Sequence, residues 1–119
     1  MGNFYAGNMA WMSAAANFFP AACINDGLFD VICIDGTLPR AKALKVLLAV
    51  ETGAHFEMEQ VSYQKVVAYR IVPHRREGVD EEYISIDGER IEYAPFQAEV
   101  HTGLGRVLGS GGGYQAPGV

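Results

Sequence analysis

The chain has 119 residues, of which 50% are hydrophobic and 19% charged, and its formal net charge is -5. This composition fits one folded domain, or part of a larger one, and excludes a chain that is disordered throughout. The nine Lys and Arg residues are scattered along an acidic chain, whereas binding to nucleic acid requires a clustered basic face. We therefore expect no nucleic-acid partner. We also expect no general attraction to anionic lipids, so any membrane contact must be apolar or local.

The N-terminal region is rich in Ala, Phe and Met between residues 9 and 24. A cleavable signal peptide would begin with a positively charged region, but no Lys or Arg precedes Arg40. Asn17 and Pro20 interrupt the apolar run, which is too short for a membrane span. We expect neither a signal peptide nor a transmembrane helix here.

Two groups of residues could be mistaken for metal ligands. Cys23 and Cys33 lack the second close pair that zinc sites use. His55, Glu57 and Glu59 alternate, so they would share one face of a strand. We interpret this face as solvated, because no further ligands converge on it, and we predict no metal site in the protein itself.

The first half of the chain predicts a buried strand followed by a helix. Residues 28–34 form a run that is apolar on both faces, which is typical of a strand covered on both sides. Thr37 is expected to cap a helix with Pro39 in its first turn. Apolar residues wrap more than half of this helix between positions 41 and 50. Because a helix with one buried face would be less apolar, we expect another element to cover its second side.

The second half of the chain predicts strands. The expected strands are 56–61, 66–72, 83–86, 90–93 and 96–101. Asp87-Gly88 lies between two arms of alternating polarity, which predicts a β-hairpin. The predicted fold class is therefore mainly β (α+β): a partial antiparallel β-sandwich with one main helix packed on it.

Five short strings, in order along the chain, resemble the C-terminal half of sphingosine kinases. They are FPAA at 19–22, DGLFD at 26–30, ETGAHF at 51–56, IDGE at 86–89 and PFQAEVH at 95–101. The opening FYAGNM at 4–9 and FFPAA at 18–22 are most similar to the fungal long-chain base kinases. Any one string is weak evidence, but five at the family's order and spacing, over residues 4–108, indicate this family.

The resemblance implies a lipid kinase of the diacylglycerol kinase-like superfamily. Such enzymes transfer the γ-phosphate of Mg-ATP to the primary hydroxyl of a sphingoid base. Their N-terminal nucleotide-binding domain carries a Gly-Asp-Gly phosphate loop and the catalytic Asp, and their C-terminal β-sandwich holds the lipid. We therefore expect residues 1–108 to be a lipid-binding lobe that is incomplete at its N-terminal side, and residues 109–119 to be a flexible Gly-rich tail.

The same resemblance implies the partners and the location of the protein. ATP and Mg²⁺ are the expected cofactors, and a sphingoid base is the expected lipid. The catalytic residues are expected to come from an N-terminal nucleotide-binding domain, so we predict none in this chain. The family implies a cytoplasmic protein in peripheral contact with membranes.

Two sites follow from the resemblance. Asp87, Gly88 and Glu89 are expected to reach ATP across the cleft between the domains, although a solvated hairpin tip would look the same in sequence. The lipid pocket is expected to involve the helix and the segment after it, through Val46, Leu47, Val50 and His55. The alternative is that these four side chains only fill the core between helix and sheet.

Other functions remain open at this point. The chain could be a non-enzymatic module that binds sphingoid lipids, or an inert fragment of a gene. It could also be the lobe of a related diacylglycerol or ceramide kinase, because lipid class depends on the shape of the pocket.

Overall fold

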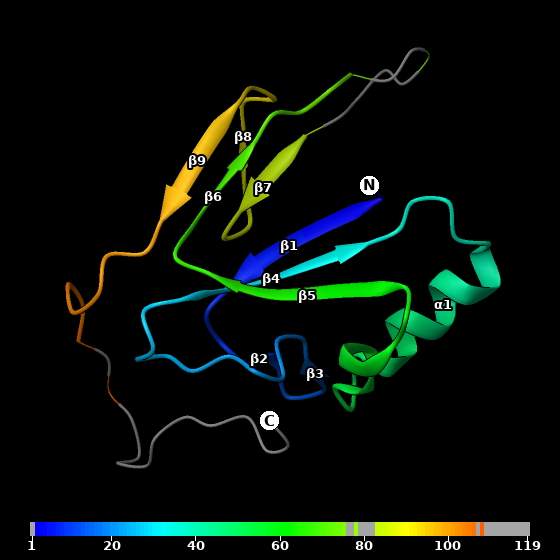
Figure 1. Cartoon of the computed structure of the whole chain (residues 1–119), viewed down its shortest axis with the longest axis horizontal. Coiled ribbons are helices and arrows are strands. Elements are labelled where there is room, and N and C mark those ends of the chain that lie inside the picture. Colours follow the sequence, from blue (N-terminus) through cyan, green and yellow to red (C-terminus); the bar gives the residue numbers. More distant parts are fainter. Residues whose placement is uncertain (1, 76–77, 79–82, 107, 109–119) are drawn as a thin grey trace. The chain divides into compact units, whose positions relative to one another are not determined.

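A computed structural model describes residues 2–75, 78, 83–106 and 108 (Figure 1). In chain order the elements are β1 (Asn3–Gly7), β2 (Trp11–Ser13), β3 (Ala16–Asn17), β4 (Phe29–Ile34), α1 (Arg40–Ala49), a 3-10 helix (Ala54–Glu57), β5 (Val61–Val66), β6 (Ala68–Ile71), β7 (Ile84–Ile86), β8 (Glu89–Ile91) and β9 (Phe96–Glu99). In this described part, all strand pairs are antiparallel and α1 is the one α-helix. This confirms the predicted mainly β class, consistent with a partial sandwich.

The chain forms two compact units. One takes in the described residues of Met1–Val67 and Val100–Val119, and the other takes in those of Ala68–Glu99. The predicted tail at 109–119 lies outside the described residues. None of the helices described is long and apolar enough to cross a membrane.

A three-stranded sheet in the order β1-β4-β5 forms the centre of the first unit. The middle strand, β4, has four buried residues and two half-buried ones. This confirms the prediction that its two faces are covered. The short hairpin of β2 and β3 belongs to the same unit.

The helix α1 begins one residue after Pro39, and no side chain of the described residues caps it. The prediction that Thr37 caps the helix is wrong. The N–H and the hydroxyl of Thr37 both donate to Oδ1 of Asp35, each at 2.9 Å. Asp35 directly follows β4, and its side chain accepts both bonds in an Asx turn that competes with capping.

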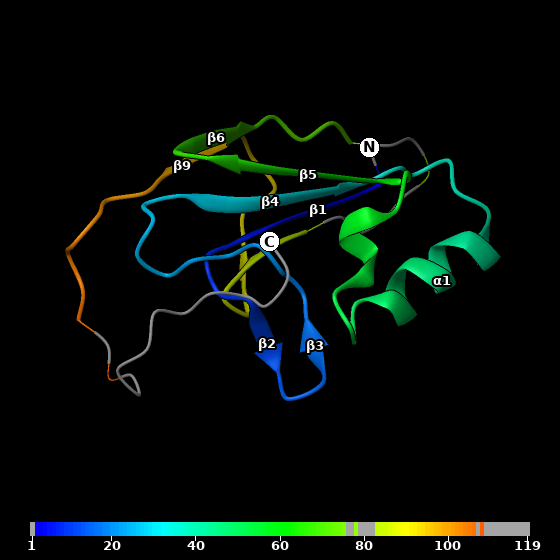
Figure 2. The same ribbon diagram turned by 60° about the horizontal axis from the view of Figure 1, so that its bottom comes forward.

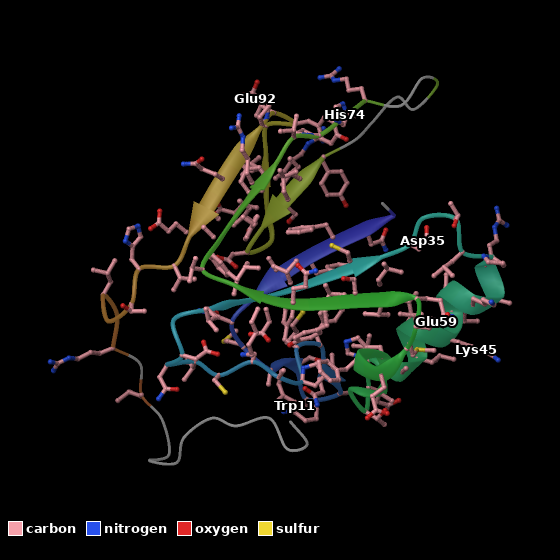
Figure 3. All side chains as sticks on the ribbon, in the orientation of Figure 1. Trp11, Asp35, Lys45, Glu59, His74 and Glu92 are labelled. Atoms are coloured by element: carbon pink, nitrogen blue, oxygen red, sulfur yellow. The ribbon has the colours of Figure 1, made fainter. Side chains whose placement is uncertain are left out.

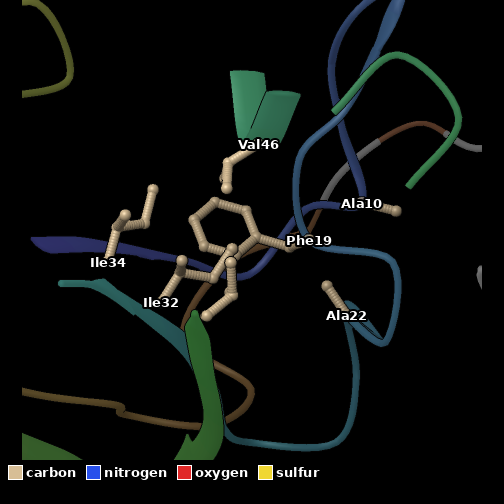
Figure 4. Close-up of a cluster of buried hydrophobic side chains, with 7 residues drawn as sticks. Ala10, Phe19, Ala22, Ile32, Ile34 and Val46 are labelled. Carbon is tan, nitrogen blue, oxygen red and sulfur yellow. The ribbon is translucent and has the colours of Figure 1, made fainter. Parts of the chain in front are cut away.

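The core of the first unit lies between α1 and the central sheet (Figure 4). Val46 of α1 is 1% exposed and packs with Ile32 of β4, which has no exposed surface. The buried cluster comprises Ala10, Phe19, Ala22, Ile32, Ile34, Val46 and Val61. Figure 2 shows α1 and the 3-10 helix together at one end of the strands β4 and β5. The two helical segments therefore close the same end of this sheet.

The segment after α1 differs from the prediction of a strand at 56–61. Gly53 has φ 78°, in the left-handed region, and residues 54–57 then form a 3-10 helix. The strand β5 begins only at Val61, after the N–H of Val61 bonds the carbonyl of Met58 at 2.9 Å. A positive φ suits glycine and turns the chain sharply, so His55 and Glu57 do not alternate on a strand.

The second unit consists of two strand pairs, β6 with β9 and β7 with β8. The strand predicted at 66–72 is interrupted at Val67, because β5 ends in one sheet and β6 begins in another. The predicted hairpin around Asp87-Gly88 is present as β7 and β8.

Candidate functional site

The hairpin tip is a two-residue turn between Ile86 and Glu89, which are the last paired residues of β7 and β8. Asp87 has φ 50° and Gly88 has φ 86°. Positive φ at both central residues matches the right-handed twist of the flanking strands, and Asp-Gly supplies it at low cost. The sequence therefore fixes this turn locally.

The tip is open to a ligand. Asp87, Gly88 and Glu89 are all exposed. A Cβ built on Gly88 would meet no atom within 4 Å, so the backbone can approach another group closely. Burial, followed by the charge of Asp87, raises the pKa of Tyr69 on β6. The tip therefore offers two carboxylates and an accessible backbone.

The four residues predicted for the lipid pocket lie in two environments. Val46 and His55 are each 1% exposed, and Val50 is 9% exposed. Leu47, in contrast, is 55% exposed. The structure brings Val46, Val50 and His55 into the interior of the first unit but leaves Leu47 on the outer side of the helix.

In its buried position the His55 ring makes one hydrogen bond within the part of the chain that the structure describes. Its Nε2 lies 2.8 Å from the carbonyl oxygen of Phe18. Because a carbonyl only accepts, Nε2–H is the donor, and Nδ1 is then an acceptor in the neutral ring. Among the described residues, Nδ1 has no partner. The ring also lies 5.8 Å from the Phe18 ring, measured between centroids, so one face of the imidazole is apolar.

Sequence reasoning missed a buried polar network between β4 and β5. Asp30 of β4 has no exposed surface. Tyr63 Oη donates to its Oδ1 at 2.6 Å, and Lys65 Nζ lies 3.3 Å from its Oδ2. Tyr63 Oη also accepts from the N–H of Ala21 at 3.2 Å, and Lys65 pairs with Asp26 at 2.7 Å. The network joins the sheet to the segment that carries residues 21–26.

The electrostatics of this network keep Tyr63 neutral and Lys65 charged. Burial, the hydrogen bond to Asp30 and the charge of Asp30 together raise the pKa of Tyr63 far above its usual value. Partial burial alone would lower the pKa of Lys65, but the hydrogen bond to Asp26 and the charge of Asp30 outweigh it and raise the pKa. The buried carboxylate is thus paired with one neutral donor and one cation, as a buried charge requires.

One signal could have revealed this network. Asp30 lies inside a run that was predicted to be covered on both faces, and a buried carboxylate needs a partner. The partners follow from the strand register, in which Asp30 pairs with Lys65 and Ile32 pairs with Tyr63. That register was not predictable while the next strand was placed at 56–61.

Within residues 2–75, 78, 83–106 and 108, no group of three or more His, Cys, Asp and Glu side chains is arranged to hold a metal ion. The carboxylates of Asp87 and Glu89 are two exposed groups at one turn. A pair of this kind fits contact with a metal through water, rather than a complete set of ligands.

Residues 3–109 match the family model described as the YegS C-terminal NAD kinase beta sandwich-like domain. The chain belongs to this family. The match covers both units of the structure and agrees with its antiparallel strands and its helix. It places the hairpin tip and the buried interior of the first unit within one known type of domain.

Several named relatives are similar to this chain. Sphingoid long chain base kinase 5 of Saccharomyces cerevisiae is 32% identical over 114 residues, which are 96% of this chain and 16% of the relative. Sphingosine kinase 2 of Homo sapiens is 36% identical over 91 residues, 75% of this chain and 13% of the relative. Sphingoid long chain base kinase 4 of Schizosaccharomyces pombe is 30% identical over 112 residues, 94% of this chain and 24% of the relative.

These matches confirm the predicted resemblance to sphingosine kinases, with fungal sphingoid base kinases among the relatives. The chain spans less than a quarter of the length of each of these three relatives. Its similarity therefore identifies the type of domain, while the activity of the whole relatives is a matter for proposal.

Proposed function

We propose that this chain is the C-terminal lobe of a lipid kinase that phosphorylates sphingoid long-chain bases with Mg-ATP. In this proposal the chain binds the lipid and closes over the ATP. The observation that carries the proposal is the similarity of most of the chain to proteins named as sphingoid long chain base and sphingosine kinases. A cytoplasmic protein in peripheral contact with membranes fits this function.

The tip at Asp87, Gly88 and Glu89 is our candidate for the contact with ATP. Its carboxylates can orient the nucleotide or hold Mg²⁺ through water, and its open backbone permits close approach to the phosphates. Bound Mg²⁺ would neutralise charge on the phosphates during transfer. The three residues would position that group, and the attacking hydroxyl would require a base from elsewhere.

The interior around Val46, Val50 and His55 is our candidate for one wall of the lipid pocket, with Leu47 at its rim. A long acyl chain needs a dry, elongated apolar space. Burial of these three side chains is what a pocket wall requires, and it is equally what a filled core requires. Nδ1 of His55, which has no hydrogen-bond partner among the described residues, would then be a buried polar group at that wall.

Phosphoryl transfer depends mainly on positioning and on neutralising charge around the phosphates. We propose that a nucleotide-binding domain supplies the phosphate loop and the base, and that this chain by itself does not transfer phosphate. The partners of the lobe would then be that domain, ATP and the sphingoid base. No nucleic acid takes part in this function.

Thermal unfolding in the presence of sphingosine tests the lipid-binding half of the proposal. A ligand at about 100 times its Kd stabilises the folded state by about 2.7 kcal/mol. For a unit of this size, that corresponds to a rise in Tm on the order of 10 °C. Leu47→Asp should reduce the rise, whereas Leu104→Asp, a control at a leucine that is 83% exposed, should leave it unchanged.

Thermal unfolding and an assay of phosphate transfer together separate the alternatives. A rise in Tm with diacylglycerol or ceramide, and none with sphingosine, would reassign the lobe to a related lipid kinase. The absence of any cooperative transition would favour an inert fragment. Binding of sphingosine without any phosphate transfer, even beside a nucleotide-binding domain, would indicate a non-enzymatic binding module.

A further inference from the structure

The chain contains three Asp-Gly pairs, at 26–27, 35–36 and 87–88. An aspartate before a glycine is prone to rearrangement, because glycine has no Cβ to obstruct attack of its nitrogen on the neighbouring side chain. All three aspartates are exposed in the structure, so contact with water does not distinguish them. The bonds that hold each carboxylate therefore decide which pair is free to react.

Asp26 is held through both of its carboxylate oxygens. Its Oδ1 accepts from the N–H of Leu28 at 2.9 Å, and its Oδ2 pairs with Lys65 Nζ at 2.7 Å. The glycine that follows is crowded as well, since a Cβ built on Gly27 would collide with Cγ2 of Thr102. The Asp26 side chain would have to break both bonds before it could turn toward the Gly27 nitrogen.

Asp35 lies just after β4 (Figure 3) and is held by one neighbour. The N–H and the hydroxyl of Thr37 both donate to its Oδ1, each at 2.9 Å. These bonds lower the pKa of Asp35, so its carboxyl stays ionised over a wider range of pH. An ionised carboxylate resists attack by a nitrogen, because it has no hydroxyl that could leave as water. Asp35 is therefore restrained in position and in charge.

Asp87 is held by neither kind of bond. Among the residues that the structure describes, none makes a hydrogen bond or an ion pair with its carboxylate. A Cβ built on Gly88 would meet no atom within 4 Å, so there is room around the glycine. The strands β7 and β8 are three residues long each, and a hairpin of two such strands is weakly held. The side chain can therefore turn toward the Gly88 nitrogen, and the turn can relax to meet it.

We propose that Asp87 is a site of spontaneous modification, at which aspartate rearranges to isoaspartate. The Gly88 nitrogen attacks Cγ of Asp87 and forms a C–N bond, while the carboxyl hydroxyl leaves as water with the proton of the N–H. Water then opens the resulting succinimide by breaking the bond between the Gly88 nitrogen and the backbone carbonyl of Asp87. The main chain now runs through Cγ, and the former backbone carbonyl is a free carboxylate. One water is released and one is consumed, so the rearrangement needs no oxidant, metal or enzyme.

The product would change the hairpin itself. Isoaspartate adds one carbon to the main chain inside a two-residue turn, and the length of that turn sets the register of Ile86 against Glu89. The free carboxylate also moves to a new position at the tip. The rearrangement joins two atoms of the tip to each other, so it requires neither ATP, nor a lipid, nor a second domain.

Ageing of the whole folded chain at neutral pH, without ATP or lipid, tests the proposal. Isoaspartate is measured through the labelled methyl groups that a protein isoaspartyl methyltransferase adds, and is located by proteolysis and mass spectrometry. We expect Asp87 to convert at least about tenfold faster than Asp26 or Asp35, because a hydrogen bond to a charged group restrains each of these two. In urea the three pairs should convert at similar rates. Because no substrate is present, failure here would leave the kinase proposal untouched.

Two variants check the assignment. Asp87→Glu keeps the charge but lengthens the side chain, which disfavours ring closure, and it should remove the methyl acceptor from the tip. Lys65→Met frees one oxygen of Asp26 and should speed its conversion, while that of Asp35 stays unchanged if the fold is retained. The matched control is Arg106→Met, which removes an exposed cation elsewhere and should leave all three rates unchanged.

Three results would overturn the proposal. One is conversion of Asp26 or Asp35 in the folded chain as fast as that of Asp87. Another is conversion of Asp87 in urea but not in the folded chain, which would mean that the turn prevents ring closure. The third is undiminished methylation of the tip in Asp87→Glu.

Discussion

Tyr63→Phe removes one oxygen from the network around Asp30 and should destabilise the first unit strongly. The lost bond joins Tyr63 Oη to a carboxylate with no exposed surface, at 2.6 Å. A hydrogen bond to a charged group is worth about 1.5–3 kcal/mol. The N–H of the buried Ala21 also loses its acceptor, which adds about 1 kcal/mol. We therefore expect a loss of about 2.5–4 kcal/mol in the free energy of unfolding.

Urea or thermal unfolding measures this loss. For a unit of this size, the Tm should fall by at least about 8 °C. Tyr5→Phe is the matched control, because its hydroxyl accepts one exposed bond among the described residues, from Asn3 at 3.2 Å. The control should lose less than about 0.5 kcal/mol. Equal losses in the two variants would refute the view that the Tyr63 hydroxyl stabilises the buried carboxylate.

Three further predictions concern single positions. Gly53→Ala should lower the free energy of unfolding, measured in urea, by at least about 1 kcal/mol more than Gly103→Ala does. Both glycines have a positive φ, but at Gly53 the new methyl group would also lie 2.8 Å from Asn17 Nδ2. Burial raises the pKa of Cys33 above its usual 9.0. Iodoacetamide should therefore label Cys33 at pH 8 more slowly than it labels a free thiol, and the rate should increase as the pH rises. Labelling of the folded chain at the rate of a free thiol would contradict this. The raised pKa of Lys65 makes its contribution to stability complete below its ordinary pKa of 10.5 and lost as pH rises through the folded value. The free energy of unfolding, measured from about pH 9 to about pH 12, should fall with rising pH in the parent chain and fall less in Lys65→Met. An equal fall in the two chains would contradict this role of Lys65.

The sequence predicted correctly those elements that depend on residues close together along the chain. The apolar run at β4 and the Asp-Gly turn of the β7–β8 hairpin were both predicted, because each depends on neighbouring residues alone. The predicted cap of α1 was wrong, because Thr37 bonds to the side chain of Asp35 instead. The strand predicted at 56–61 failed because one positive φ, at Gly53, redirects the chain into a 3-10 helix.

The candidate sites were predictable to different extents. The exposed tip at Asp87-Gly88 followed from the turn itself. For the helix, apolar composition alone did not separate Val46, which is buried, from Leu47, which is exposed. Burial on a helix that is apolar all round depends on which side meets the sheet, and that is set by tertiary packing. Asp30 was missed because its partners lie on β5, more than 30 residues away along the chain.

Phosphate transfer from labelled ATP to sphingosine tests the central claim most directly. The chain is assayed with Mg²⁺ alone, and again after addition of a separately expressed N-terminal nucleotide-binding domain of the family. We predict no transfer by the chain alone and transfer on mixing. Transfer by the chain alone, or none on mixing two folded partners, would contradict its role as a complementary lobe of a sphingoid base kinase.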